Sequence, residues 1–283
     1  MSEKVWFVTG ASRGLGLEMV RAALRAGDRV IATARAVDGV AERIGGASDN
    51  LLVLFVDVAD RESIDAAVGK ATERFGRIDV LVNNAGYGQM GHFETVSPGA
   101  IERQFATNVF GLMDVTRAVL PGMRERGAGH VFNLSSIGGS RGYAGSSIYC
   151  ASKFAVEGFS EGLAAEVDAF GIRVTLVEPG FFRTDFLDGS SVAYSDVELP
   201  DYAGRNAEHR STFDELSHHQ AGDPARLGDA LVALSRADDP PMRFAAGSDA
   251  LQFIGTDFAR RQLELATWSG LTASTDFRER THP

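Results

Sequence analysis

A tyrosine and a lysine four residues apart, Tyr149 and Lys153, are the pair in this sequence best suited to acid–base chemistry. The segment around them has helical character, and residues four apart share one face of a helix. A free phenol has a pKa of about 10, so it needs help to exchange protons at neutral pH. A nearby ammonium favours the phenolate and lowers that pKa. The spacing permits a proton donor and acceptor, and an exposed helical pair is the alternative.

A glycine-rich segment near the N-terminus is the second candidate for chemistry. It reads Thr9-Gly10-Ala11-Ser12-Arg13-Gly14-Leu15-Gly16, between an apolar run and a helical stretch. Glycine permits a tight turn and close approach to a pyrophosphate, whose charge the N–H groups of a helix N-terminus stabilise. An ordinary turn is the alternative. The position between a first strand and a first helix predicts a nucleotide cofactor.

The elements that must position these residues alternate along the chain. Each apolar run has the length of a buried strand, and longer helical stretches separate the runs, which is typical of βαβ units. We predict an α/β fold with a doubly wound, mostly parallel sheet of about seven strands and helices on both faces. The expected strands are Val5–Val8, Val30–Ala34, Leu51–Val56, Val80–Val82, Val131–Leu134, Val174–Val177 and Arg243–Ala246. The expected helices are Leu15–Ala26, Ser63–Phe75, Pro98–Arg126, Ser147–Phe170, Pro224–Ser235 and Asp249–Thr267.

The pattern weakens after Pro179 and Gly180, where residues 181–187 are aromatic and apolar and residues 190–219 are polar and mixed. We interpret residues 181–222 as a substrate-loop insertion of short helices within one domain, residues 1–283. Insertions of this kind commonly form lids and specificity elements. An apolar pocket could be built from Phe181, Phe182, Phe186 and Leu187, with Tyr87 and Tyr143 facing it, although the same residues could equally pack the insertion.

The composition excludes several classes of function. The 283 residues carry a formal net charge of −10, which disfavours nucleic acid and anionic membranes as partners. The single cysteine, Cys150, excludes a disulfide framework and a cysteine-rich metal site. The N-terminal segment does not resemble a secretory signal, and no apolar run approaches the roughly 18 residues that span a bilayer. We therefore expect a cytoplasmic protein without a metal.

Several weaker signals are discounted. Residues 158–162 match the G-x-S-x-G pattern of hydrolases, but no strand precedes Ser160, so we expect small residues that pack a helix. His209, His218 and His219 lie in the polar insertion without a convincing carboxylate or cysteine frame, so we expect exposed histidines rather than a metal site. Cys150 is expected to be a small buried residue.

The glycine spacing, with Gly10, Gly14 and Gly16, resembles the T-G-x-x-x-G-x-G turn of the short-chain dehydrogenase/reductase family rather than G-x-G-x-x-G. The resemblance continues in order along the chain. Residues 83–86 resemble its N-N-A-G segment, Asp57-Val58 its adenine-contacting pair, and residues 179–184 its P-G-x-x-x-T segment beside the nicotinamide. The resemblance implies a Rossmann-type fold and hydride transfer between a nicotinamide cofactor and a carbonyl or alcohol.

The resemblance also assigns site residues. Tyr149 would donate a proton to the carbonyl oxygen, Ser136 would orient and polarise that oxygen, and Lys153 would bind the nicotinamide ribose and tune Tyr149. Asn108 would hold a water that links Lys153 to solvent. Ser135 is the adjacent alternative to Ser136, and only the spacing to Tyr149 decides between them. The implied cofactor-binding residues are Gly10, Ser12, Arg13, Gly14, Leu15, Gly16, Arg35, Asp57, Val58, Asn84, Ala85, Gly86, Tyr149, Lys153, Pro179, Gly180 and Thr184.

The choice of cofactor is read at the end of the second strand. An acidic residue there would bind the ribose 2′-hydroxyl of NAD, but the segment ends in Arg35. Arg13 lies in the glycine turn, and two guanidinium groups suit a 2′-phosphate. We therefore expect a preference for NADP(H), with NAD(H) possible. The alternative is that both arginines are solvated surface residues.

The leading hypothesis is an NADP(H)-dependent reductase of a ketone or aldehyde, acting on an apolar small molecule. A catalytically idle NADP-binding redox sensor is the alternative from another class. A sugar-nucleotide epimerase or dehydratase shares Y-x-x-x-K but usually has differently spaced glycines and a longer C-terminal domain. Family members commonly pair through the helix that carries the tyrosine and lysine, so we expect a homodimer or homotetramer. The tail through Trp268 and Phe277 could block a second interface, which favours the dimer.

Overall fold

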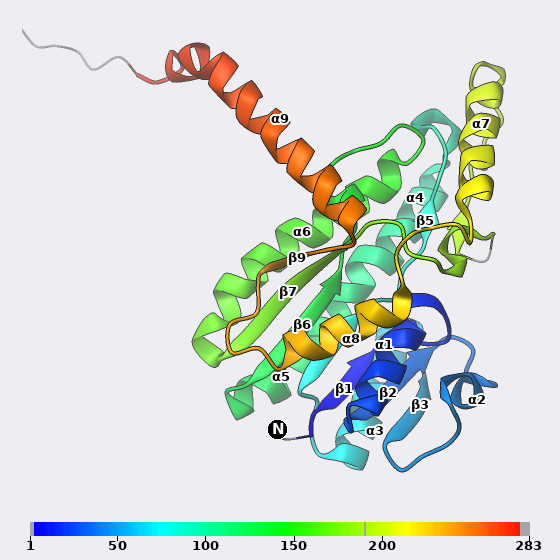
Figure 1. Ribbon diagram of the computed structural model, residues 1–283, viewed down its shortest axis with the longest axis vertical. Coiled ribbons are helices and arrows are strands. Elements are labelled where there is room, and N and C mark those ends of the chain that lie inside the picture. The colour runs from blue at the N-terminus through cyan, green and yellow to red at the C-terminus, as the bar shows by residue number, and fades with distance from the viewer. Residues whose placement is uncertain (1–2, 190, 278–283) are drawn as a thin grey trace, which may run out of the picture.

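The computed structural model describes residues 3–189 and 191–277, and its centre is one parallel sheet (Figure 1). The strand order is β3-β2-β1-β4-β6-β7-β9, and every pairing is parallel. The α/β prediction and the seven strands are confirmed. The strands are β1 (Val5–Val8), β2 (Arg29–Ala34), β3 (Leu51–Phe55), β4 (Val80–Asn83), β6 (Gly129–Leu134), β7 (Ile172–Pro179) and β9 (Arg243–Ala246).

The core consists of two apolar layers, one on each face of the sheet. Alternate side chains of a strand point to opposite faces, so Val5 and Phe7 of β1 join one layer and Trp6 and Val8 join the other. The first layer packs under α3 (Arg61–Phe75), α5 (Leu112–Arg126) and α6 (Ser147–Val167). The second packs under α1 (Gly14–Arg25), α2 (Val40–Ile44) and α8 (Pro224–Ser235). Helices therefore cover both faces, as predicted.

The helix predicted over residues 98–126 is interrupted. It consists of α4 (Pro98–Phe105), the π-helical segment η2 (Ala106–Gly111) and α5. π-helical turns often occur at functional sites, and this one contains Asn108. At its end, a Cβ on Gly111 would lie 2.6 Å from the Val58 carbonyl oxygen, so a glycine permits the close approach of these segments.

Several short elements were not predicted, because they contain too few residues to show a period. They are α2, the two-residue strands β5 (Gly88–Gln89) and β8 (Val192–Ala193), and the 3-10 turns η1 (Phe93–Thr95), η3 (Ile137–Gly139) and η5 (Asp185–Leu187). The end of the helix predicted over Ser147–Phe170 is the 3-10 turn η4 (Asp168–Phe170). The last helix, α9 (Ser248–Ala273), extends beyond the predicted Asp249–Thr267. β5 and β8 pair with each other and connect the segment after β4 to the insertion.

The insertion forms a lid-like element at one end of the sheet (Figure 1). Short helices were predicted, but the main element is the 17-residue helix α7 (Pro200–Leu216). None of its residues is fully buried. Hydrogen bonds join α7 to residues 92–94. Tyr202 donates one to Glu94, and Asn206 Oδ1 accepts one from the His92 backbone N–H at 3.2 Å. The absence of a buried apolar face explains why its sequence appears irregular.

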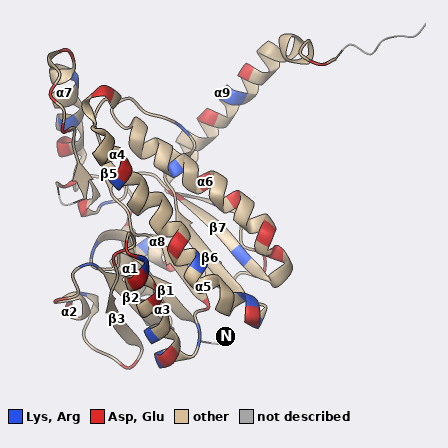
Figure 2. Cartoon of the chain, turned by 180° about the vertical axis from the view of Figure 1, so that it is seen from behind, with Lys and Arg blue, Asp and Glu red and all other residues tan. Residues whose placement is uncertain are grey.

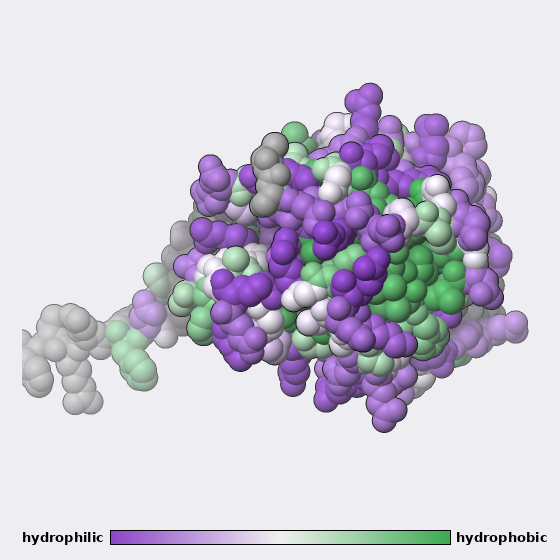
Figure 3. Space-filling model, turned by 90° about the horizontal axis from the view of Figure 1, so that it is seen from below, coloured by the Kyte–Doolittle hydropathy of each residue, from purple (hydrophilic) through white to green (hydrophobic). Residues whose placement is uncertain are grey.

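The edge strand β3 leaves one side of the sheet unpaired. Its apolar side chains are only partly covered, and Phe55 is 53% exposed. Viewed from below, hydrophobic residues gather in one area of a largely hydrophilic face (Figure 3). Acidic and basic residues are dispersed over the outer helices (Figure 2). No described helix is long and apolar enough to cross a membrane.

A buried histidine in β6 predicts sensitivity to acid. Burial lowers the pKa of His130 from 6.5 to about 3, and the ring lies 2.9 Å from Thr175 Oγ1. Between these values the unfolded chain binds a proton that the native protein does not, so stability falls as the pH falls. One pKa unit is worth about 1.4 kcal/mol, which sets an upper limit of about 5 kcal/mol.

We expect His130→Gln to lose less stability than the wild type between pH 6.5 and 4, measured by denaturant unfolding. The exposed His219→Gln is the control and should follow the wild type. Parallel stability curves for wild type and His130→Gln would contradict a neutral buried His130.

Candidate active site

A cavity of about 730 Å³ lies at the carboxyl ends of the strands. Its walls come from the glycine turn, the ends of β2, β4, β6 and β7, the N-terminal part of α6 and the insertion. Ligands of doubly wound sheets bind at these strand ends. Every predicted cofactor-binding residue except Gly16 lines this cavity.

The glycine turn presents backbone N–H groups to the cavity. Gly10 and Gly14 have φ values of +67° and +56°, which glycine adopts without strain. Asn84 Nδ2 donates hydrogen bonds to the carbonyl oxygens of Thr9 at 2.9 Å and Gly10 at 3.1 Å, which fixes the turn. Helix α1 begins at Gly14, and among the described residues no N-cap side chain bonds to its first turn. This arrangement suits an anionic group.

Gly16 contributes by packing rather than by lining the cavity. A Cβ there would lie 2.5 Å from Asn84 Nδ2 and closer still to the Gly10 carbonyl oxygen. Any other residue would push α1 away from the turn. Gly16 therefore permits the close approach that shapes the binding turn, and a direct contact between Gly16 and a cofactor stays a prediction.

The far end of the cavity is lined by Arg35, Asp57 and Val58. Asp57 Oδ1 accepts a hydrogen bond from the Ala59 backbone N–H at 3.0 Å, which holds its loop. Arg35 is exposed at the end of β2, and among the described residues none forms an ion pair or hydrogen bond with its guanidinium. Arg13 lies in the wall beside the turn. Two cations therefore flank this end of the cavity.

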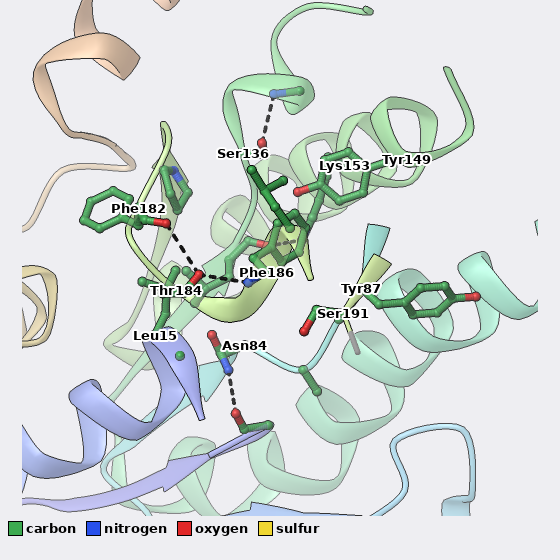
Figure 4. A pocket seen from close by; sticks show the side chains of 18 of the residues that line it. Leu15, Asn84, Tyr87, Ser136, Tyr149, Lys153, Phe182, Thr184, Phe186 and Ser191 are labelled. Atoms are coloured by element: carbon green, nitrogen blue, oxygen red, sulfur yellow. Dashed lines mark hydrogen bonds between the residues drawn. The ribbon is translucent and has the colours of Figure 1, made fainter. Parts of the chain in front are cut away.

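The tyrosine, lysine and serine predicted to do chemistry come together at the other end (Figure 4). Tyr149 and Lys153 lie one turn apart on α6, and Ser136 follows β6. Lys153 is buried, and its Nζ donates a 2.7 Å hydrogen bond to the Leu134 carbonyl oxygen. The Tyr149 ring lies 5.9 Å from the ring of Phe186 in the insertion. Three elements therefore meet at one phenol.

The electrostatics of this cluster differ from the expectation of a lowered tyrosine pKa. Burial raises the pKa of Tyr149 to about 12, and the neighbouring Ser136 hydroxyl acts in the opposite direction. Burial lowers the pKa of Lys153 to about 8, and the charge of Glu157 partly opposes this. Burial therefore changes both pKa values more than the charge of one group changes the pKa of the other. The reason is that loss of water disfavours the charged form of each group, the phenolate of Tyr149 and the ammonium of Lys153.

The choice between the two serines follows from their surroundings. A Cβ on Gly138 would lie 3.5 Å from Ser136 Oγ and 3.4 Å from the Tyr149 ring, which places both beside the same glycine. Ser135 is buried behind them on the side of Glu157, whose pKa is raised by burial and lowered to a smaller extent by the Ser135 hydroxyl. Ser136 is thus the serine beside the phenol, and Ser135 serves the buried carboxyl.

Asn108 is buried in η2 and does not line the cavity directly. Its Nδ2 donates to the Tyr87 carbonyl oxygen at 3.0 Å and to Ser152 Oγ at 3.3 Å, and its Oδ1 accepts from the Tyr87 N–H at 3.1 Å. The side chain therefore joins η2 to α6 and to the segment after β4. Among the side-chain atoms, only the remaining acceptor capacity of Oδ1 could hold a water.

The outer half of the cavity is apolar. The residues predicted for it, Phe181, Phe182, Phe186, Leu187 and Tyr143, line it as expected. Tyr87 also lines it, although its ring points away from Tyr149 (Figure 4). The lining residues that sequence reasoning missed include Met90, His209, Phe213 and Phe253, which come from distant parts of the chain.

His209 corrects the expectation of three exposed histidines. His218 and His219 are exposed, but His209 is half-buried and packs against Phe213 with ring centroids 4.4 Å apart. Burial lowers the pKa of His209, with a smaller contribution from His92. The signal was the spacing of Tyr202, Asn206, His209, Phe213 and Leu216, which share the inner face of α7.

The other discounted signals behave as expected. Ser160 is fully buried inside α6, where its hydroxyl accepts a hydrogen bond from Asn133 at 2.8 Å. Cys150 is buried beside Tyr149. Asp185 and Asp188 do approach His218, so carboxylates lie closer to that histidine than the sequence indicated. Asp188 also accepts a 2.8 Å hydrogen bond from Ser217, which ties the ends of the insertion together.

The known sequences that are similar to this chain are described as dehydrogenases, oxidoreductases or reductases. Residues 4–193 match the family model described as short chain dehydrogenase. The chain is 37% identical to "Oxidoreductase BOA17" of Botryotinia fuckeliana (strain B05.10), over 93% of this chain and 99% of that protein. It is 36% identical to a 3-ketodihydrosphingosine reductase of Bacteroides thetaiotaomicron, over 87% of this chain and 89% of that protein.

Solved structures agree with the sequence relatives. A short-chain dehydrogenase from Streptomyces avermitilis has a TM-score of 0.88 and 41% identity, over 96% of this chain and all of that one. A serine dehydrogenase complexed with NADP+ has a TM-score of 0.69 and 30% identity, over 85% and 92%. A 3-ketoacyl-(acyl-carrier-protein) reductase from Brucella melitensis complexed with NADH has a TM-score of 0.68 and 28% identity, over 82% and 90%.

The packing of Gly16 generates a prediction. Gly16→Ala should destabilise the protein by about 1–3 kcal/mol, because the added methyl meets backbone that cannot easily move, and it should weaken cofactor binding at least tenfold. The matched control is Gly69→Ala in α3, where a Cβ meets nothing within 4 Å and helix propensity predicts a gain of up to about 1 kcal/mol. Denaturant unfolding and fluorescence titration with NADPH measure both effects. If the two variants have the same free energy of unfolding and the same affinity for NADPH, the glycine turn can accommodate a side chain at position 16.

Proposed function

The chain belongs to the short-chain dehydrogenase/reductase family, and from this premise we propose that it is an NADP(H)-dependent reductase of apolar ketones or aldehydes. Membership makes it an NAD(P)-dependent dehydrogenase or reductase. The observation that carries the finer proposal is the meeting of Tyr149, Ser136 and Lys153 inside a cavity whose opposite end is a glycine turn flanked by arginines.

The residues present fit a phosphorylated dinucleotide. The glycine turn offers N–H groups at the uncapped start of α1, and a Cβ on Gly10 would lie 2.9 Å from the Ala85 Cα, so only glycine leaves this approach open. Arg35 and Arg13 would hold the 2′-phosphate, while Asp57 and Val58 would contact the adenine. Relatives of known structure are complexed with NADP+ or with NADH, which supports a nicotinamide cofactor for this chain. The two arginines support NADP(H) over NAD(H).

The bound nicotinamide would supply or accept the hydride, and the chain's own residues would handle the proton. Tyr149 Oη would donate its proton to the oxygen of the carbonyl that is being reduced. A phenol whose pKa lies near 12 remains protonated at neutral pH, which suits a donor in the reductive direction. Ser136 Oγ would hydrogen-bond the same oxygen and orient the carbonyl. Lys153 would bind the nicotinamide ribose and bring a positive charge near Tyr149.

Replacement of the Tyr149 proton would depend on Lys153 and Asn108. Lys153 carries a pKa of about 8 and can pass a proton near neutral pH. Asn108 Oδ1 would hold a water between this ammonium and solvent, as its position behind α6 suggests. A Cβ on Gly86 would lie 3.1 Å from this oxygen, so a glycine keeps the space open.

The substrate wall supports an apolar carbonyl compound. Its described members are mostly aromatic or aliphatic: Met90, Tyr143, Phe186, Leu187, Phe213 and Phe253. A relative named 3-ketodihydrosphingosine reductase shares 36% identity. A screen of aliphatic and aromatic ketones, aldehydes and secondary alcohols with NADPH or NADP+, following nicotinamide absorbance, tests the proposal. A preference for charged, hydrophilic carbonyl compounds would contradict it.

The proton donor has its own test. Tyr149→Phe removes only a hydroxyl, so the protein should fold and bind NADPH while kcat falls about 10²- to 10⁴-fold. The control is Tyr194→Phe, whose buried hydroxyl has no hydrogen-bond partner among the described residues and lies outside the cavity. Near-normal turnover of Tyr149→Phe would remove this residue from the mechanism.

The cofactor preference has a separate test. A charge-assisted contact is worth about 1.5–3 kcal/mol, so Arg35→Ala should weaken NADPH about ten- to a hundredfold and leave NADH nearly unchanged. Arg13→Ala should show a smaller effect of the same kind. Arg35→Asp should go further, because a carboxylate repels the phosphate and can accept a hydrogen bond from the NADH ribose.

The readout is kcat/KM for both cofactors, and Arg124→Ala, an exposed arginine near the end of α5, is the control. An unchanged NADPH/NADH ratio in the Arg35 variants would identify this arginine as a solvated surface residue.

A further inference from the structure

Helix α9 leaves the body of the protein as an arm (Figure 1). Its first turns are anchored: Ala250, Ile254 and Asp257 are buried. Arg261 makes the last contacts between this helix and the body of the protein. Its Nε lies 2.6 Å from Asp257 Oδ2, and its guanidinium lies 5.9 Å from the Phe154 ring. From residue 262 to residue 277 every residue is exposed. We call residues 262–277 the arm.

The exposed surface of α9 is apolar along one stripe. Leu251, Phe258 and Leu265 are seven residues apart, and Trp268 follows three positions later. This spacing places them on one side of a helix, as in the seam between paired helices. Their exposed fractions are 70%, 54%, 71% and 60%. A surface helix normally turns such a stripe toward a core, but this stripe faces away from the body's own residues.

The free part of α9 has no packing against the body of the protein to stabilise it. Isolated helices shorter than about 12–15 residues are marginal in water, even when rich in alanine. The unsupported part covers only residues 262–273 and contains Gly270 and two threonines. Exposed apolar patches rimmed by polar residues commonly mark interaction sites. The arm is therefore a docking element.

The charges of the arm disfavour a lipid surface. Helices that lie on membranes are rich in lysine and arginine. The arm contains Glu264 and Asp276 and no lysine or arginine, and the protein has a net charge of −10 (Figure 2). Anionic headgroups would repel this surface. A partner with an apolar and weakly charged face fits better.

We propose that the arm packs on a second copy of this chain and forms part of a two-fold dimer. The apolar surface continues from the foot of α9 onto the body, because Phe154 of α6 is 39% exposed beside Arg261. The neighbouring segment η2 adds Phe110, which is 58% exposed. A two-fold axis presents every such patch twice, so the arm of one copy meets the aromatic face of the other.

The available area agrees with a dimer. A buried aromatic side chain contributes about 150–250 Å². Phe110, Phe154, Phe258 and Trp268 are roughly half exposed, so eight such side chains in a dimer would remove about 600–1,000 Å² from water. Leu251 and Leu265 extend this toward the roughly 1,200–2,000 Å² of a stable interface. The C-terminal segment expected to block an interface would thus form one.

The two tryptophans provide a direct test. Trp6 is fully buried and donates a 2.9 Å hydrogen bond to Asp28, whereas Trp268 lies on the stripe. In a dilution series, the emission of the full-length protein should shift to longer wavelength as the mass by light scattering falls from dimer to monomer. Trp268→Phe should abolish the shift. A monomeric mass throughout, up to about 100 μM, would overturn the proposal.

A matched pair of variants separates the stripe from the rest of the arm. Leu265→Glu should weaken dimerisation at least tenfold, while Thr267→Glu, two positions further and on the opposite side of the helix, should leave the mass unchanged. Circular dichroism confirms that both fold. If Leu265→Glu remains dimeric with the wild-type emission, the arm is not the interface. If phosphatidylglycerol vesicles shift Trp268 emission at concentrations where the protein is monomeric, the arm binds lipid and the proposal fails.

Discussion

The hydrogen bond from Lys153 Nζ to the Leu134 carbonyl oxygen is the contact on which the active-site geometry depends. It ties helix α6 to the end of strand β6 at the point where the chain leaves the sheet. Ser136 lies two residues beyond Leu134, and Tyr149 lies one helical turn before Lys153. One buried bond therefore sets the distance between the hydroxyl, the phenol and the ammonium. The bond also gives a desolvated ammonium a partner, without which its burial would be costly.

This arrangement has an electrostatic cost that the residues behind α6 partly offset. Glu157 lies one turn after Lys153, is buried, and opposes the fall in the Lys153 pKa. Glu178 in β7 lies nearby, and burial together with Glu157 raises its pKa to about 7. Arg243 reaches both carboxyls, at 3.1 Å from Glu157 and 3.7 Å from Glu178. A single arginine compensates two buried acids incompletely, so Glu178 retains a proton under mildly acidic conditions.

The parts of the fold that could be predicted are those with local signals. The seven strands are short apolar runs that are buried on both faces, and the glycine turn and the Tyr149–Lys153 pair are set by spacing within one segment. The tyrosine pKa could not be predicted, because it depends on how much water Ser136, Phe186 and the strand ends exclude. α7 was missed because its inner residues, such as Asn206 and His209, are polar and touch only the rim. The tail through Trp268 and Phe277 was expected to block an interface, and its role could not be read from the sequence, because an apolar stripe looks the same whether a core or a second chain covers it.

The elements around the two halves of the cavity differ in how deeply their side chains are buried. The half proposed to hold the cofactor rests on β1, β2 and β4, whose side chains are almost entirely buried, and its turn is fixed by hydrogen bonds from the Asn84 side chain to backbone carbonyl oxygens. The substrate half includes α7, which has no fully buried residue and is held by a few hydrogen bonds at its rim. Local stability follows buried apolar contact, so the insertion belongs to the less stable end of the structure. Residues such as His209 and Phe213 can therefore change without disturbing the sheet. This separation explains why spacing along the chain indicates the reaction while the substrate has to be read from the insertion.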